Sequence, residues 1–200
     1  MLREAAPNVR ESCKGVARRV KEREVDEDAI VHVRQGAYAF GSPFVPGSQI
    51  LATANIHTCI IVMAYNPQAK VGYMGHLDYE LLVPQAVASM QLIGAGRIVI
   101  FGGDGAHSVP IIMELERRIS DELPYARIVG KDILRGPYRR SQTIAINTSN
   151  GMIFIPAAPV KEGHVLRDGL VYDGMHVANE HAFADIVAQA ARRAQDQASL

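Results

Sequence analysis

The sequence is short of cysteine, net charge and long hydrophobic runs, and each shortage excludes a class of protein. Its 200 residues include two cysteines, Cys13 and Cys59, so a disulfide scaffold is not expected and a reducing compartment is. Twenty-one basic residues balance twenty-one acidic ones, which removes the global electrostatic reason to expect a nucleic-acid partner. Hydrophobic residues make up 48% and charged residues 21%, the balance of an ordinary folded protein.

Membrane and export signals are also missing. No apolar run reaches the ~18 residues that a membrane span needs. The first residues, MLREAAPNVRESCKG, lack the apolar region of a signal peptide. We therefore expect a cytoplasmic protein without membrane insertion.

Hydrophobic periodicity predicts alternating strands and helices. Helices are expected over 2–24, over 84–94 with its end at Gly94, after Ser108 as the cap, and over 179–198 with Asn179 as the cap. Strands are expected over 29–40 with a kink at Gly36, and over 97–101, 126–129 and 165–172. A hairpin is predicted over 142–147 and 152–156, around Asn150-Gly151. This order favours an α/β fold, a layered α-β sandwich with a mixed β-sheet core and helices packed outside.

The most informative stretch runs from Ile50 to Asp78, where two apolar strand runs flank a turn at 66–70. A hairpin brings its far ends together, so Cys59 and His76 are predicted to lie nearly opposite each other, about 5 Å apart. A thiol and an imidazole at that separation can share a proton, as a thiolate nucleophile requires.

This pair indicates thiol chemistry. His76 would take the proton of Cys59 and later donate it to a leaving amine, while backbone N–H groups near Cys59 form an oxyanion hole. Thr53 would orient His76 or bind the substrate carbonyl. Each residue also has an ordinary structural explanation, since buried cysteines are usually inert and threonine is common in strands.

The spacing of these residues resembles the CheD family, chemoreceptor glutamine deamidases of bacterial chemotaxis, which are distantly similar to the deamidase domain of cytotoxic necrotising factors. In that family a Thr stands six residues before the catalytic Cys and a His seventeen after it, as Thr53, Cys59 and His76 do here. Flanking motifs are similar too: Gln35-Gly36-Ala37-Tyr38-Ala39, Tyr65-Asn66-Pro67, Gly75-His76, Ile100-Phe101-Gly102-Gly103 and Arg139-Arg140 to Asn150-Gly151-Met152.

The resemblance covers residues 28–158, which would be the deamidase domain. Residues 1–27 would be an N-terminal helical extension, and residues 159–200 a C-terminal extension with a helix packed on the same domain. The implied substrate is a protein that carries a glutamine side chain, with Cys59, His76 and Thr53 as catalytic residues and no cofactor or metal. One difference lies directly before Cys59, where His57-Thr58 stand in place of the family's Gly-Ser. Glycine tolerates backbone conformations that histidine does not, so this difference affects the oxyanion hole.

Two alternatives stay open. The chain could be a non-catalytic CheD-like binding protein that has lost the oxyanion hole. It could instead bind a phosphate ligand at Gly102–Gly105, a turn between a predicted strand and a predicted helix. That turn lacks the spacing of the known nucleotide-binding motifs. His107 with Asp104, and His176 with His181, are the other histidine groupings, and neither predicts a metal site.

Overall fold

The computed structural model describes residues 22–103, 107–133, 142–158, 160, 176–179, 182–188 and 191–192. The predicted strand over 165–172 and nearly all of the predicted helix over 2–24 lie outside these residues. Where that helix was expected to end, residues Glu22–Arg23 form a short strand, β1, which pairs with β10.

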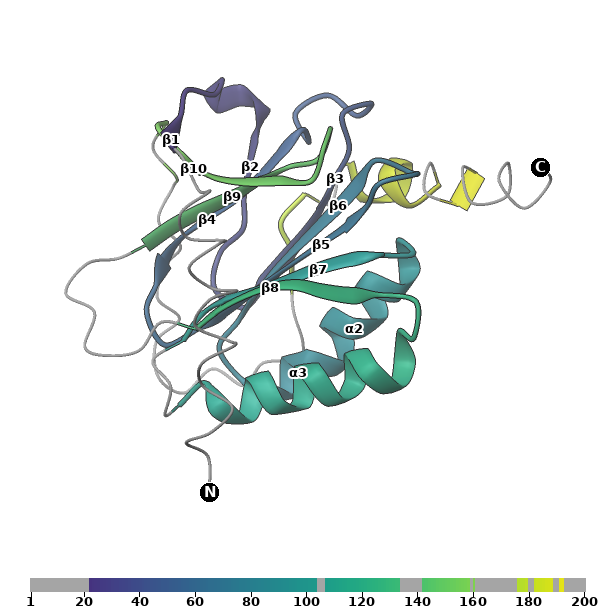
Figure 1. Ribbon diagram of the computed structural model, residues 1–200. Coiled ribbons are helices and arrows are strands. Elements are labelled where there is room, and N and C mark those ends of the chain that lie inside the picture. The colour runs from purple at the N-terminus through teal and green to yellow at the C-terminus, as the bar shows by residue number, and fades with distance from the viewer. Residues whose placement is uncertain are drawn as a thin grey trace.

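The fold is α/β, with two mixed sheets and few helices among the described residues (Figure 1). The six-stranded sheet has the order β11-β3-β6-β5-β7-β8, with β3 Ala37–Gly41, β5 Ile60–Asn66, β6 Val71–Leu77, β7 Arg97–Gly102, β8 Arg127–Ile133 and β11 His176–Val177. The five-stranded sheet has the order β1-β10-β9-β4-β2, with β2 Ile30–His32, β4 Ile50–Ile56, β9 Gln142–Asn147 and β10 Met152–Pro156. The helices are η1 Glu27–Ala29, η2 Glu80–Leu82, α2 Val83–Leu92 and α3 Val109–Glu122.

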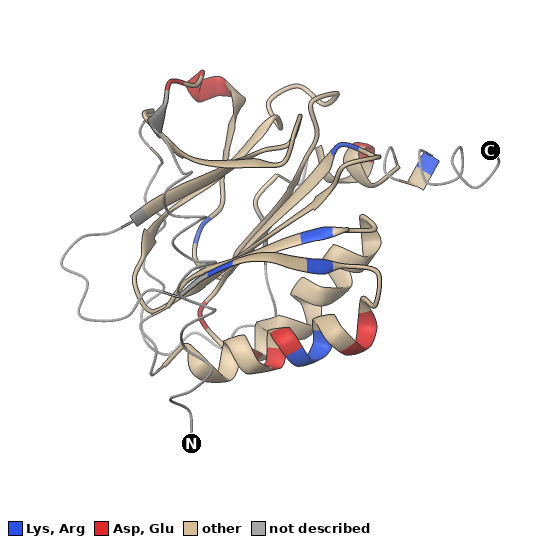
Figure 2. Cartoon of the chain, in the orientation of Figure 1, with Lys and Arg blue, Asp and Glu red and all other residues tan. Residues whose placement is uncertain are grey.

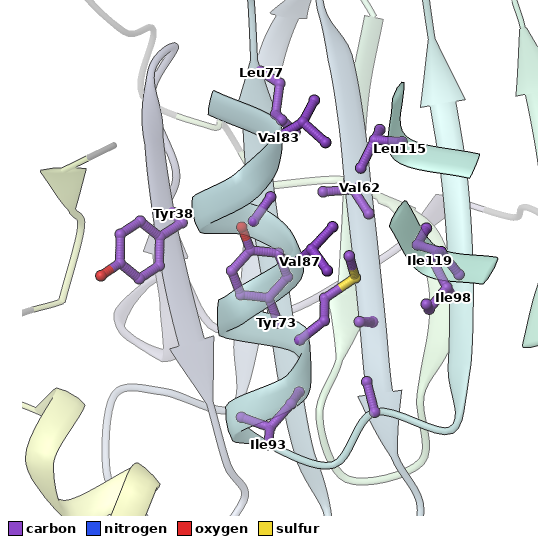
Figure 3. Close-up of a cluster of buried hydrophobic side chains, with 14 of the residues drawn as sticks. Tyr38, Val62, Tyr73, Leu77, Val83, Val87, Ile93, Ile98, Leu115 and Ile119 are labelled. Carbon is purple, nitrogen blue, oxygen red and sulfur yellow. The ribbon is translucent and has the colours of Figure 1, made fainter. Parts of the chain in front are cut away.

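Helices α2 and α3 cover one face of the six-stranded sheet. Their apolar residues, among them Val83, Val87 and Leu115, pack against Val62 and Tyr73 of the sheet (Figure 3). The opposite face of the same sheet packs against the five-stranded sheet through a second cluster that includes Ile61, Met74 and Ile144. The observed core thus consists of two sheets with helices outside one of them, where the sequence suggested one mixed sheet.

The predicted strand over 29–40 is two strands in different sheets. β2 pairs with β4 in the five-stranded sheet, and β3 pairs with β6 in the six-stranded sheet. Between them the chain turns at Gly36, which has a φ of 71° and donates its N–H to the His76 carbonyl at 2.9 Å. The expected kink is therefore a turn that carries the chain from one sheet to the other.

Several other predicted elements are confirmed. The two hairpins form as β5–β6 and β9–β10, α2 ends just before Gly94, and β7 contains the predicted strand over 97–101. The predicted apolar face of α3, formed by Ile111, Ile112, Leu115 and Ile119, is buried. The opposite face of α3 carries alternating charges (Figure 2), with Arg117 and Arg118 paired to neighbouring carboxylates.

The described part of the C-terminal segment contacts the six-stranded sheet. β11 pairs with β3, and the Asn179 side-chain amide donates to the Phe40 carbonyl at 2.6 Å. Residues 182–188 are helical, and Ala182 and Ile186 are buried in the cluster that α2 and α3 form with the six-stranded sheet. None of the described helices combines the length and the apolarity that crossing a membrane requires.

Candidate functional site

Thr53 and His76 meet between the two sheets. Thr53 lies on β4 of the five-stranded sheet, and His76 lies on β6 of the six-stranded sheet. Both side chains are buried, and Thr53 Oγ1 lies 2.8 Å from His76 Nδ1. A hydrogen bond at this distance fixes the orientation of the imidazole.

An irregularity in β4 directly follows Thr53. The pairing of β4 with β9 changes register between Thr53 and Ile56. Asn55, inside this irregularity, has a φ of 59°, a left-handed conformation that asparagine tolerates better than most residues. Bulges of this kind bend a strand and redirect its side chains. Here the bend leads the chain from Thr53 into the turn that carries Cys59.

Cys59 lies immediately before β5, which is the neighbour of β6. The register pairs Ile61 with His76 and Ile60 with Leu77, so the predicted placement of Cys59 nearly opposite His76 is off by two residues. The reason is that Asn66 belongs to β5 and pairs with Val71, which shortens the turn. A shift of two residues keeps the face of the sheet, so Cys59 and His76 are diagonal neighbours on one face, about 7–8 Å apart at Cα.

The Asn66 side chain closes that shorter turn. Its Oδ1 accepts hydrogen bonds from the backbone N–H groups of Gln68 and Ala69, both at 3.0 Å. Its Nδ2 donates to the Ile93 carbonyl at 2.8 Å and thereby ties the turn to the end of α2. Asn66 thus stabilises the turn at the far end of the hairpin whose register relates Cys59 to His76.

The environment of Cys59 favours the neutral thiol. Its side chain is 5% exposed, and burial together with the negative charge of Asp78 raises the pKa of the thiol to about 12. Two donors act in the opposite direction and lower the pKa of Cys59, the Thr58 side chain and the backbone N–H of Cys59 itself. Both donors stabilise negative charge on the sulfur.

The environment of His76 favours the neutral imidazole. The ring is 1% exposed, and burial lowers its pKa to about 4. Among the described residues, Nε2 has no hydrogen-bond partner. With the proton on Nδ1 and donated to Thr53, Nε2 carries the lone pair that a general base needs.

Two residues near Cys59 were misassigned or missed from the sequence. Ser108 precedes α3 but its side chain makes no capping bond; its hydroxyl donates instead to the Thr58 carbonyl at 2.7 Å. Asp78 accepts a hydrogen bond from Gln35 Nε2 at 2.9 Å and influences the thiol. The register of the hairpin, had it been known, would have identified Asp78 as the residue opposite Cys59.

The predicted phosphate-binding turn is described only in part. Gly102 and Gly103 have φ angles of 100° and 83°, and Asp104, Gly105 and Ala106 lie outside the described residues. A Cβ atom on Gly102 would lie 2.6 Å from the Cys59 carbonyl oxygen. The close approach of this turn to the Cys59 segment therefore explains why residue 102 is a glycine, and a bound ligand is not needed to explain it. In the described part of the chain, no group of three or more His, Cys, Asp or Glu side chains could hold a metal ion.

No protein-family model matches this chain, and no curated protein sequence is significantly similar to it.

Proposed function

We propose that this chain is a cysteine-dependent amidohydrolase that converts protein glutamine to glutamate with release of ammonia. The observation that carries the proposal is the Thr53–His76 hydrogen bond, with Cys59 on the same face of the neighbouring strand. Thr53 and His76 thus come from strands of different sheets, and Cys59 comes from the turn that precedes β5. Their spacing in the sequence supports a CheD-like site, and helices outside a β core agree with CheD-like layering.

In the proposed reaction His76 Nε2 accepts the Cys59 proton as the sulfur attacks the carboxamide carbon. The carbonyl oxygen becomes an oxyanion, held by the Cys59 N–H and the Thr58 hydroxyl. The imidazolium then donates its proton to the leaving nitrogen, and ammonia departs from a thioester on Cys59. Water attacks the thioester with His76 as the base, which yields glutamate and restores the thiol.

The resting protonation states decide the order of the proton transfer. A thiol whose pKa is raised to about 12 and an imidazole whose pKa is lowered to about 4 do not form an ion pair in the free protein. The proton therefore moves together with attack on the carbonyl, when the oxyanion hole takes up the developing charge. This differs from hydrolases that hold a preformed thiolate.

The proposal is tested by ammonia release from unfolded, glutamine-rich polypeptides. We expect the wild-type chain to release ammonia and Cys59→Ala to release none, while both proteins unfold at similar temperatures. A Cys13→Ala variant is the matched control and should keep full activity. Ammonia release by Cys59→Ala at the wild-type rate would contradict the catalytic assignment.

One observation favours a second candidate, a binding protein without catalysis. Cys59 and His76 are 5% and 1% exposed, so a glutamine side chain does not reach them without movement of the residues that cover them. A binding protein would retain a glutamine-containing partner and release no ammonia. The same comparison of the wild-type chain with Cys59→Ala separates the two functions, because only a hydrolase loses ammonia release with the thiol.

A further inference from the structure

Ser108 connects the start of α3 to the peptide bond directly before Cys59. Its side chain is fully buried, and its hydroxyl donates to the Thr58 carbonyl at 2.7 Å across 50 residues of sequence. The backbone of Ser108 is already helical, with φ −88° and ψ −14°, and its side chain does not cap the helix. The hydroxyl has therefore exchanged the usual capping role of serine for a contact with the Cys59 turn.

The Thr58 carbonyl and the Cys59 N–H belong to the same peptide unit. Every peptide bond of the described chain is trans, so the two groups point in opposite directions within one rigid plane. A donor that fixes the carbonyl thus also fixes the direction of the N–H. Because the Thr58 carbonyl points toward Ser108 Oγ, the Cys59 N–H points away from Ser108.

The packing around Ser108 leaves it little freedom. A Cβ atom on Gly103 would lie 2.6 Å from Ser108 Oγ and 2.8 Å from Ile60 Cδ1, so the glycine makes room for the serine. Gly102 approaches the Cys59 carbonyl in the same way. Residues Gly102, Gly103 and Ser108 therefore hold the segment from Thr58 to Ile60 on one side, through one hydrogen bond and the close approach of the two glycines to the Cys59 backbone and the Ile60 side chain.

We propose that Ser108 is a positioning residue that aims the Cys59 N–H at the oxyanion. The inference rests on the proposed hydrolase function and adds a residue that acts through the Thr58–Cys59 peptide without touching substrate. It also explains how an oxyanion donor is held where His57-Thr58 precede the cysteine. A glycine before the cysteine would let the peptide adopt the required orientation. Here the hydrogen bond from Ser108 holds the Thr58–Cys59 peptide in that orientation.

The test compares two properties of Cys59 that depend differently on the peptide orientation. Ammonia release from a glutamine-rich polypeptide passes through an oxyanion, whereas alkylation by iodoacetamide displaces iodide and forms none. We expect Ser108→Ala to lower kcat by at least about tenfold with KM nearly unchanged, since loss of one oxyanion donor typically costs about 100-fold or more. The rate of Cys59 alkylation at mildly alkaline pH, measured by peptide mass spectrometry, should stay at the wild-type value.

Thr148→Val is the matched control. Thr148 is fully buried, and its hydroxyl donates to the Gln49 carbonyl at 2.8 Å, the same kind of contact in another part of the fold. Its loss should lower the melting temperature and leave kcat unchanged. Ser108→Cys, which keeps the volume but weakens the donor, repeats the test if Ser108→Ala does not fold.

Each outcome decides a different claim. A selective fall in kcat for Ser108→Ala or Ser108→Cys supports the inference. Wild-type kcat in a folded Ser108 variant overturns it and leaves the hydrolase proposal standing. An equal fall in kcat and in alkylation also overturns it, because Ser108 would then act on the thiol. Absence of ammonia release from the wild-type chain would overturn the hydrolase proposal itself.

Discussion

Thr53 Oγ1 and His76 Nδ1 lie 2.8 Å apart although their strands belong to different sheets. The hydrogen bond crosses an otherwise apolar layer between the sheets, where Ile61, Met74 and Ile144 pack. Burying two polar groups in such a layer costs the free energy of removing them from water, and their mutual hydrogen bond offsets that cost. In this layer the pair leaves one imidazole nitrogen, Nε2, available for chemistry.

The Thr53 hydroxyl is predicted to be needed for both stability and turnover. Thr53→Val keeps the shape of the side chain but leaves Nδ1 of a buried ring without its partner, which costs about 1–3 kcal/mol. Turnover should fall as well, because the imidazole loses the partner that holds its orientation. Thr53→Ser restores the hydroxyl and should recover most of both losses. Unfolding by urea and ammonia release, measured side by side, check this; full turnover in Thr53→Val would show that Thr53 is purely structural.

Cys59 is predicted to react slowly with iodoacetamide in the native protein. Because burial and Asp78 raise the pKa of Cys59 to about 12, almost no thiolate is present at neutral pH. In a Cys13→Ser background, alkylation should be much slower than that of a free cysteine and should accelerate strongly in denaturant. Asp78→Asn removes the charge next to the thiol and should increase the native rate. Rapid native alkylation below pH 7 would mean that a preformed thiolate exists.

Acid is predicted to destabilise the fold through His76. The pKa of His76 is lowered to about 4 in the folded state, against ~6.5 for an unfolded histidine. Between these values the unfolded chain binds the proton and the folded chain does not, so the free energy of unfolding decreases as pH falls. The loss is about 3 kcal/mol for this one group. It should be largely absent in His76→Gln, while the exposed His57→Gln should keep the wild-type profile. Identical urea-unfolding profiles for all three proteins from pH 7 to pH 4 would contradict the assigned burial effect.

Gly102 is predicted to be required for the position of the Cys59 turn. Gly102→Ala would place a methyl group 2.6 Å from the Cys59 carbonyl oxygen, at a φ of 100° that disfavours alanine. It should lower both the melting temperature and the rate of ammonia release. Gly96 precedes the first residue of β7, and a Cβ atom added there would have no neighbour within 4 Å. Gly96→Ala is therefore the matched control. Equal melting temperatures for the two variants would show that the Cys59 turn moves to accommodate the methyl group without loss of stability.

Sequence spacing places Cys59 and His76 on one face of a sheet, but it does not reveal that the core has two sheets. Side chains on a strand alternate between the two faces of the sheet, so the predicted hairpin put Cys59 and His76 on one face. A register error of two residues does not change the face, and the two residues still share it. The contact of Thr53 with His76 requires a second sheet. The sequence did not predict that sheet, because residues 29–40 have the pattern of one continuous strand. Nothing local in that pattern shows that its two halves join different sheets.

Ser108 illustrates what local signals cannot show. A serine before an apolar helix with proline in its first turn has every feature of a helix cap. Its hydroxyl contacts Thr58 because tertiary packing brings a turn 50 residues away within reach. The same is true of Asp78, whose effect on Cys59 follows from strand pairing and from no motif.

The most direct test of the central claim is to trap the thioester on Cys59. Hydroxylamine competes with water for such an intermediate and converts the glutamine side chain to a γ-hydroxamate, which mass spectrometry distinguishes from glutamate. We expect the wild-type chain to form hydroxamate on a glutamine-rich polypeptide in proportion to the hydroxylamine added, and Cys59→Ala to form none. Glutamate formation without hydroxamate in the wild-type chain, or equal hydroxamate from both proteins, would contradict nucleophilic attack by Cys59.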